Sequence, residues 1–155
     1  IVNVCSQGKP VNIKKGQFLS PWEMQNVVDK ARSTGNEQIM VCERGASFGY
    51  NNLVVDMRAF PILRSLGYPV VYDATHSLQL PGGGDGVTAG QAEYIEPLAS
   101  AAVAAGIDGL FVEVHDNPAR AKSDGQNALP LERLEPLLRH LLRLDSVRRE
   151  AASVR

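Results

Sequence analysis

Hydrophobic residues gather in four short runs along the chain, at residues 11–13, 38–42, 69–74 and 109–114. None of these runs alternates regularly between apolar and polar residues, which is typical of strands that are buried on both faces. A segment with helical signals follows each run. The pattern therefore predicts four strand–helix units, whose strand starts are roughly 30 to 40 residues apart.

The first predicted helix has a defined start and stop. Ser20 is followed by Pro21 and, three residues after the serine, by Glu23. This spacing predicts a capping box with the proline at the first helical position. Gly35 is expected to end the helix.

The other predicted helices have similar start and stop signals. Pro61 is expected to start or kink the second helix and Gly67 to stop it. The third helix is rich in alanine, contains Pro97 in its early part and stops at Gly106. The segment 129–150 has leucines at helical spacing, which predicts a helix with a core-facing stripe.

Repeated strand–helix units form a parallel sheet with right-handed crossovers. Two α/β architectures fit: an open doubly wound sheet, or part of a (β/α)8 barrel. Periodicity does not choose between them, but both collect functional residues at the carboxyl ends of the strands. A chain of 155 residues is long enough for one core, so we expect residues 1–155 to form a single domain.

Composition narrows the function classes. Hydrophobic residues make up 44% of the chain, which predicts a globular protein, and a net charge of −1 gives no overall basic field for nucleic acid. No apolar run approaches the ~18 residues of a membrane span, and the first residues lack the pattern of a signal peptide. Two cysteines without Cys-x-x-Cys spacing favour a reduced, cytoplasmic protein.

Basic residues follow the first two predicted strands. Lys14 and Lys15 come directly after the first, and Arg44 comes after the second. Because parallel strands end on one rim, we expect a cationic sector there that suits a phosphate or carboxylate ligand. The alternative is a surface lysine pair with Arg44 in a salt bridge to Glu43.

The last two strands end near a histidine and two acids: His76, Glu113 and Asp124. One imidazole nitrogen and two carboxylates suit a divalent metal such as Mn, Fe or Zn. The three residues are far apart in sequence, and a histidine at a strand end is also a common hydrogen-bonding residue. His115 is a competing ligand, whereas His140 is expected to be a surface or structural residue.

The glycine-rich loop at 77–90 does not match a phosphate-binding fingerprint, because it lacks a tight Gly-x-Gly-x-x-Gly and a Walker lysine. It is expected to be either a lid over a strand-end site or a disordered surface loop. No Gly-x-Ser-x-Gly elbow supports serine hydrolase chemistry. Cys42 lies within a predicted strand and is expected to be a core residue rather than a nucleophile.

Five motifs, from about Gly8 to the C-terminal helix, together resemble 3-deoxy-D-manno-octulosonate 8-phosphate (KDO8P) synthases. They are PVNIKKGQFLSPWEM, CERGASFGYNNLVVDMR, YDATHSLQLPGG, GLFVEVH and KSDGQNALPLERLE. The resemblance implies a (β/α)8 TIM barrel, of which this chain covers about strands 5–8. Residues 1–7 do not resemble the family's approach to strand five.

The same resemblance implies a transferase that condenses phosphoenolpyruvate with arabinose 5-phosphate and releases phosphate. Its product feeds lipopolysaccharide (KDO) synthesis in Gram-negative bacteria, and the family enzyme is usually a homotetramer. Two alternatives stay open. One is a related 3-deoxy-heptulosonate 7-phosphate synthase, which uses erythrose 4-phosphate. The other is a non-catalytic, truncated half-barrel.

The resemblance also assigns roles to residues around the substrate. Lys14 and Arg44 match positions that hold the phosphate and carboxylate of phosphoenolpyruvate, and Gln79 matches a residue beside the metal site. Lys14 and Arg44, with His76 and Asp124, form the implied catalytic set. The loop from residue 81 to residue 90 matches the lid.

A divalent metal is implied at His76, Glu113 and Asp124, since several motifs look like the metal-dependent branch of the family. Its identity, Mn, Fe, Zn or Mg, is left open. The fourth family ligand is a cysteine on the first barrel strand, which has no counterpart in this chain, and Cys5 lies too close to the KKGQ motif to replace it. If that cysteine is essential for metal binding, the resemblance implies that this chain binds no metal.

Overall fold

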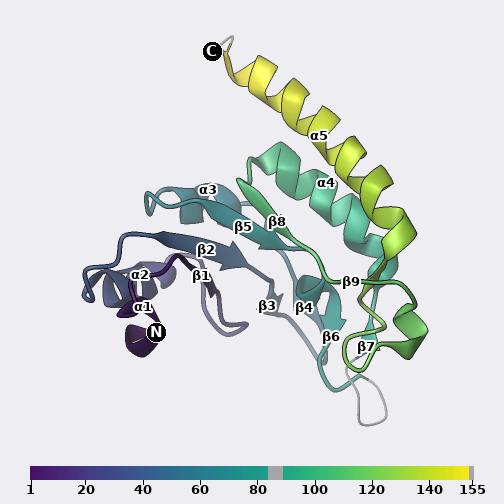
Figure 1. Cartoon of the computed structure of the whole chain (residues 1–155), viewed down its shortest axis with the longest axis horizontal. Coiled ribbons are helices and arrows are strands. Elements are labelled where there is room, and N and C mark those ends of the chain that lie inside the picture. The colour runs from purple at the N-terminus through teal and green to yellow at the C-terminus, as the bar shows by residue number, and fades with distance from the viewer. Residues whose placement is uncertain (84–88, 154–155) are drawn as a thin grey trace.

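The computed structural model describes residues 1–83 and 89–153. Its main sheet contains four parallel strands: β1 (Val11–Lys14), β2 (Ile39–Glu43), β5 (Val70–Asp73) and β8 (Gly109–Phe111) (Figure 1). Each lies within or next to one of the four predicted apolar runs, so the predicted α/β pattern is confirmed.

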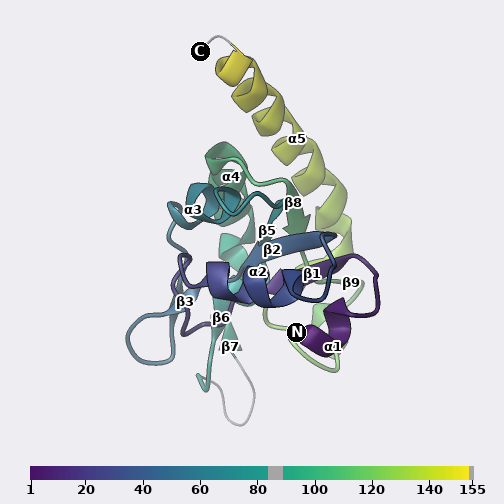
Figure 2. The same cartoon turned by 90° about the vertical axis from the view of Figure 1, so that its left-hand side faces the viewer.

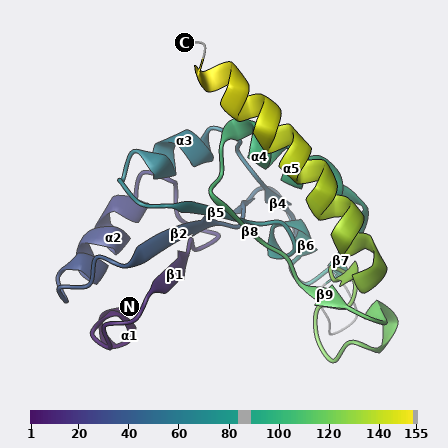
Figure 3. The same ribbon diagram turned by 45° about the horizontal axis from the view of Figure 1, so that its top comes forward.

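The sheet order settles which architecture the chain follows. The order β1-β2-β5-β8 is the order of the strands in the chain, with no reversal. A doubly wound sheet reverses its strand order and carries helices on both faces, whereas a barrel adds each unit on the same side. Figure 3 shows the longer helices on one outer side of a curved sheet, as in a barrel wall.

Within residues 1–83 and 89–153, five α-helices accompany the sheet. They are α1 (Val2–Cys5), α2 (Met24–Arg32), α3 (Ala59–Arg64), α4 (Ile95–Ala105) and α5 (Leu131–Ser153). Three short 3₁₀ helices lie between them: η1 (His76–Leu78), η2 (Ala92–Tyr94) and η3 (Pro118–Arg120). Among the described residues, no helix combines the length and apolar character that a membrane crossing requires.

The predicted capping box is present, but α2 starts later than expected. The Ser20 amide donates to Glu23 Oε2 at 2.7 Å, and the Glu23 amide donates to Ser20 Oγ at 3.4 Å. The prediction that Pro21 is the first helical residue was wrong. The Met24 amide bonds the Pro21 carbonyl, so a three-residue turn precedes the helix.

Glycines follow the three helix ends, but only Gly106 is itself a C-cap, because α2 and α3 end earlier, with Ser33 and Ser65 as their caps. Gly35, Gly67 and Gly106 have φ values of 81°, 85° and 97°, in the left-handed region that favours glycine. Pro61 and Pro97 are each the third residue of their helix, α3 and α4. In this first turn a missing amide costs nothing.

The core lies between the sheet and the helices. Phe60 of α3 packs edge-on against Tyr72 of β5, with ring centroids 5.5 Å apart. The predicted leucine stripe of α5 is only half buried, because Leu138 and Leu142 stay exposed beside the buried Leu137 and Leu141. Figure 2 shows that the C-terminal part of α5 extends away from the sheet.

Short strands cluster beyond the carboxyl ends of the main sheet (Figure 1). The antiparallel pairs are β3 (Ala46–Ser47) with β4 (Leu53–Val54) and β6 (Gln79–Leu80) with β7 (Ala89–Gly90). The parallel pair is β9 (Val114–His115) with β10 (Leu129–Pro130). These connections build the rim that carries the candidate site.

The single strand predicted at 109–114 was wrong in its second half. The chain leaves the sheet after Phe111 and starts the separate strand β9 at Val114. Between them, the Glu113 amide donates to Thr75 Oγ1 at 2.7 Å, and the Glu113 carbonyl accepts from the Leu129 amide at 2.8 Å. These bonds redirect the backbone and bring Glu113 to the rim.

Candidate active site

Lys14 lies on the inner face of the sheet, which the helices do not cover. Its Nζ is 2.6 Å from Asp73 Oδ2 and 4.3 Å from the centroid of the Phe111 ring. Its side chain is still 38% exposed. Lys14 is therefore held in place but remains accessible to an anionic ligand.

Lys15 points the other way, because successive residues of a strand face opposite sides. Its side chain is buried, and Nζ donates to the carbonyls of Gly16, Leu19 and Gly45 and lies 3.5 Å from Glu43 Oε1. The prediction that Lys15 belongs to the cationic sector was wrong. It ties the loop after β1 to the loop after β2.

Glu43 completes this structural pair on the helix-covered face. Its Oε1 accepts the backbone amides of Arg44 at 2.9 Å and Gly45 at 2.5 Å. Burial raises the pKa of Glu43 above its usual value, although Lys15 and the two amides oppose the shift. The alternative salt bridge between Glu43 and the Arg44 side chain is not formed, since Lys15 is the ion-pair partner.

Arg44 reaches the rim instead. Its Nη2 donates to Gln79 Oε1 at 2.8 Å, and the residue is only 8% exposed. Its Nη1 is buried and has no hydrogen-bond partner among the described residues. Burial lowers the pKa of Arg44 from its usual value, but an arginine still stays charged at neutral pH. A buried guanidinium with an unused donor suits an anion.

Gln79 joins the basic residues to the acidic ones. Its Oε1 accepts from Arg44, and its Nε2 donates to Asp124 Oδ1 at 2.7 Å. Asp124 has a left-handed backbone with φ 52°, which aspartate tolerates better than most residues. Residues from three distant parts of the chain thus meet through one amide side chain.

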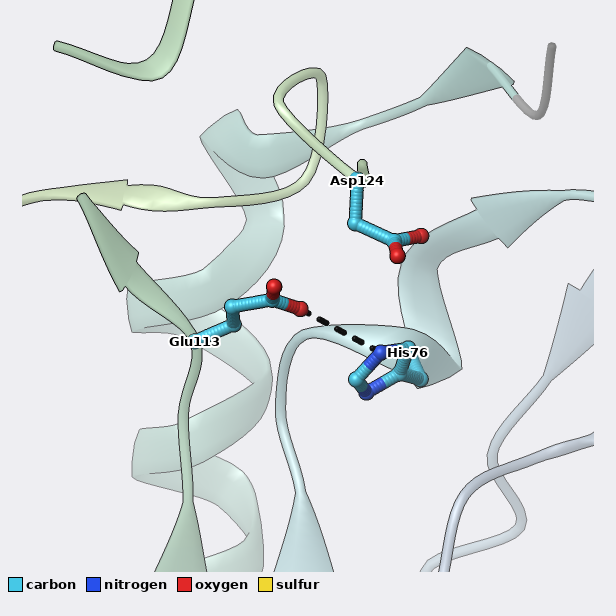
Figure 4. A group of neighbouring side chains, drawn as sticks. All are labelled: His76, Glu113 and Asp124. Atoms are coloured by element: carbon cyan, nitrogen blue, oxygen red, sulfur yellow. Dashed lines mark ion pairs between the residues drawn. The ribbon is translucent and has the colours of Figure 1, made fainter. Parts of the chain in front are cut away.

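His76, Glu113 and Asp124 converge on one space, as Figure 4 shows. His76 Nε2 lies 3.3 Å from Glu113 Oε2, and one ligand atom from each of the three residues lies within 4.8 Å of the others. One imidazole nitrogen with two carboxylates is a donor set that divalent Mn, Fe or Zn accepts. The residues present therefore fit a metal ion.

The other two histidines lie outside this cluster. His115 Nδ1 is 2.9 Å from Asp116 Oδ1 and accepts the Asn117 amide, and His140 Nε2 is 3.0 Å from Ser100 Oγ on an exposed helix face. His115 is not among the residues whose ligand atoms come together, so it does not compete for the site in this geometry. His140 is a surface residue, as predicted. Cys42 is fully buried, as predicted, and burial raises its pKa to about 12.

Sequence reasoning missed the role of Asp73. This residue is fully buried at the end of β5, and it accepts bonds from His76 Nδ1 at 2.9 Å and from the amides of Thr75 and His76. Burial alone would raise the pKa of Asp73, but the bonds from His76 and Lys14 outweigh burial and lower it. An aspartate at the end of a predicted strand commonly accepts the backbone amides two and three residues later, as in an Asx turn. The sequence therefore carries a local signal for this role of Asp73.

The predicted lid at residues 81–90 is only partly covered, because residues 84–88 lie outside the described residues. On its far side, Gly90 lies so close to Asn127 that an added Cβ would be 1.8 Å from Asn127 Oδ1. Asn127 is fully buried, and both polar atoms of its side chain lack partners among the described residues.

This fold and this rim define an α/β unit of the TIM-barrel type, with two basic residues that suit an anion and a histidine–carboxylate cluster that fits a metal at its strand ends. Comparison with known proteins supplies the family. The profile of the DAHP synthetase I family matches residues 1–149, and the chain belongs to this family, whose fold is a TIM barrel. The match begins at residue 1, so the expectation that residues 1–7 depart from the family was wrong.

Curated relatives named 2-dehydro-3-deoxyphosphooctonate aldolase, another name for KDO8P synthase, confirm the predicted resemblance. The proteins of Xanthomonas campestris pv. campestris (strain B100) and Xanthomonas oryzae pv. oryzae (strain PXO99A) are 66% and 65% identical to this chain. The protein of Stenotrophomonas maltophilia (strain K279a) is 64% identical. Each match covers 95% of this chain but 53% of the relative, so the chain spans about half the length of these proteins.

Proposed function

We propose that this chain supplies about strands 5–8 of a TIM-barrel KDO8P synthase, as one domain of residues 1–155. The enzyme would condense phosphoenolpyruvate with D-arabinose 5-phosphate to give 3-deoxy-D-manno-octulosonate 8-phosphate and phosphate. The names of relatives at 64–66% identity support this activity. As in the family, we expect a cytoplasmic homo-oligomer.

One observation carries the proposal. Gln79 bonds both Arg44 and Asp124, so an anion-binding side and a metal-binding side are parts of one site. The proposed reaction needs this combination, because one substrate is an anionic enol phosphate and the other presents an aldehyde. Neither half of the rim would suffice alone.

Lys14 and Arg44 would hold phosphoenolpyruvate. The accessible ammonium of Lys14 and the unused Nη1 of Arg44 are matched to a phosphate and a carboxylate. With the substrate fixed, its C3 attacks the aldehyde carbon of the sugar phosphate, and water adds at C2 before phosphate leaves. Catalysis would come mainly from positioning and from fixed charges.

His76, Glu113 and Asp124 would hold the divalent metal, and Gln79 would orient Asp124. When bound, such an ion acts as a Lewis acid that orients an aldehyde oxygen or a water. The fourth ligand implied by the family, a cysteine of the first barrel strand, has no counterpart in this chain. Mn, Fe, Zn and Mg all stay candidates for the ion.

The second candidate is a synthase of 3-deoxy-heptulosonate 7-phosphate, which uses erythrose 4-phosphate. The description of the matching family, DAHP synthetase I, favours it. The names of the relatives favour the first candidate. The two activities share the phosphoenolpyruvate and metal residues, so only the aldose separates them.

The test supplies the purified protein with phosphoenolpyruvate, Mn²⁺ and either aldose phosphate, and measures phosphate release. Faster release with arabinose 5-phosphate is the expected result, and release with erythrose 4-phosphate alone would establish the second candidate. Saturable binding of phosphoenolpyruvate without turnover of either sugar would instead identify a non-catalytic half-barrel.

A further inference from the structure

Asp73 is more deeply buried than any of the residues assigned to substrate or metal. It is fully buried on the inner face, at the end of β5, one of the two inner strands of the sheet. Its Oδ2 is shared between Lys14 Nζ at 2.6 Å and His76 Nδ1 at 2.9 Å. One carboxylate oxygen therefore contacts both the anion-binding lysine and the metal-binding histidine.

The bond to His76 fixes which ring nitrogen is free. With its proton on Nδ1 and directed to Asp73, the imidazole presents the lone pair of Nε2 toward Glu113, 3.3 Å away. A carboxylate behind a ligating histidine orients the ring and makes the ligand nitrogen more basic. The negative charge on Asp73 is thus available to strengthen a metal–His76 bond.

The bond to Lys14 draws on the same charge. While Lys14 pairs with Asp73, its ammonium offsets part of the charge that would otherwise support His76. An anion that binds Lys14 competes for the ammonium and weakens its hold on Asp73. The Phe111 ring contacts both partners of this junction, 4.3 Å from Lys14 Nζ and 5.7 Å from the centre of the His76 ring.

We propose that Asp73 is a positioning residue that couples the two sides of the site, so that anion binding at Lys14 tightens metal binding at His76. By linkage, the metal tightens anion binding by the same factor. The inference rests on the proposed function for the identity of the two sides. Beyond that function, it states that the anion and the metal each strengthen the binding of the other through one buried carboxylate.

The test measures the affinity of the protein for Mn²⁺, by electron paramagnetic resonance of the free ion, with and without saturating inorganic phosphate. In the unaltered protein, phosphate is expected to tighten Mn²⁺ binding about 5-fold or more. Asp73→Asn keeps the shape but removes the charge, so Mn²⁺ should bind about 10–100-fold more weakly and the phosphate effect should vanish.

Two further variants separate coupling from misfolding. Lys14→Gln alters a partly exposed side chain, so the protein should fold; Mn²⁺ should bind at least as tightly as before, and phosphate should no longer matter. Asp108→Asn is the matched control, since Asp108 accepts the Val70 amide at the opposite end of β5. Both the Mn²⁺ affinity and the phosphate effect should survive there.

The proposal is overturned if phosphate tightens Mn²⁺ equally in Asp73→Asn and Lys14→Gln, because the anion would then contact the metal directly. An absence of Mn²⁺ binding to the unaltered protein would also overturn it. No sugar takes part in this experiment, so its result is independent of turnover. Coupling without turnover would refute the proposed function alone, and turnover without coupling would refute only the role of Asp73.

Discussion

Lys14 and Lys15 are neighbours in the chain, and each pairs with a buried carboxylate, but the two pairs lie on opposite faces of the sheet. Lys14 and Asp73 face the open inner side, and the lysine keeps 38% of its side chain exposed. Lys15 and Glu43 form a sealed pair on the other face, with side chains that are 1% and 2% exposed. The same kind of pair thus leaves a lysine accessible for the proposed ligand on one face and anchors loops on the other, and the alternation of the strand decides which.

The largest effect on stability is expected when one partner of the sealed pair is removed. Glu43→Ala leaves the Lys15 ammonium buried without its carboxylate and frees two amides, so the free energy of unfolding should fall by about 3–5 kcal/mol. Lys14→Met is the matched variant on the open face and should cost less, about 1.5–3 kcal/mol, because Asp73 keeps its bonds from His76 and two backbone amides. Urea unfolding measures both, and equal losses would contradict the distinction between the faces.

Arg44 tests the open face directly. Arg44→Ala removes a charge-assisted contact to the anion and should raise the KM or Kd for phosphoenolpyruvate about 10–100-fold. Arg44→Lys keeps the charge but loses the fork that serves Gln79 and the anion together, so it should recover only part of the affinity. An unchanged value in the alanine variant would remove Arg44 from the site.

The two buried acids should respond to acid in opposite ways. The pKa of Asp73 is lowered, so the unfolded chain binds its proton more readily, and the stability that Asp73 provides is lost as the pH falls below about 3.8. The pKa of Glu43 is raised, so the folded protein binds that proton more readily. Its contribution to stability therefore declines as the pH rises from about 4.5 through the raised value.

Urea titrations across pH 3–7 check both signs, with Asp73→Asn and Glu43→Gln as the variants. Asp73→Asn should flatten the loss of stability at the acid end, and Glu43→Gln should flatten the decline above about pH 4.5. A variant that leaves the slope in its own window unchanged would count against the pKa direction given for that residue.

The smallest expected effect concerns the loop that Lys15 anchors. The Leu19 carbonyl accepts a hydrogen bond from Lys15 Nζ, and the next residue, Ser20, forms the capping box with the exposed Glu23. Ser20→Ala should cost about 1 kcal/mol in urea unfolding, well below the loss from Glu43→Ala. A loss as large as that of Glu43→Ala would mean that the exposed cap, rather than the sealed pair, holds this loop.

The sequence pattern was sufficient for local features. The apolar runs located all four main strands, and glycines lay at or within three residues of the ends of α2, α3 and α4. The predicted burial on both faces was wrong for β1, which alternates between half-buried and exposed residues, and for β8, which is half-buried and ends in the exposed Phe111. The different environments of Lys14 and Lys15 also follow from the two-residue period of a strand, which places successive side chains on opposite faces. Strand alternation at the end of a predicted strand deserves the same weight as the presence of a charge.

The remaining features depend on contacts between distant residues. Gln79 reaches residues that are 35 and 45 positions away, and Glu113 is redirected by Thr75, which is 38 positions away. No local pattern encodes which of several rim acids an amide or hydroxyl will meet. The resemblance to KDO8P synthases supplied the identity of the rim residues before any geometry was considered, but it did not indicate how Asp73 connects them.

The winding of the sheet in chain order has a consequence for protein design. Because β1 and β8 are the two outer strands, a tandem fusion of two copies of this unit would bring β8 of the first repeat beside β1 of the second, with every strand running in the same direction. Rings assembled from duplicated halves require this polarity, so the unit is a suitable module for building a symmetric eight-stranded scaffold.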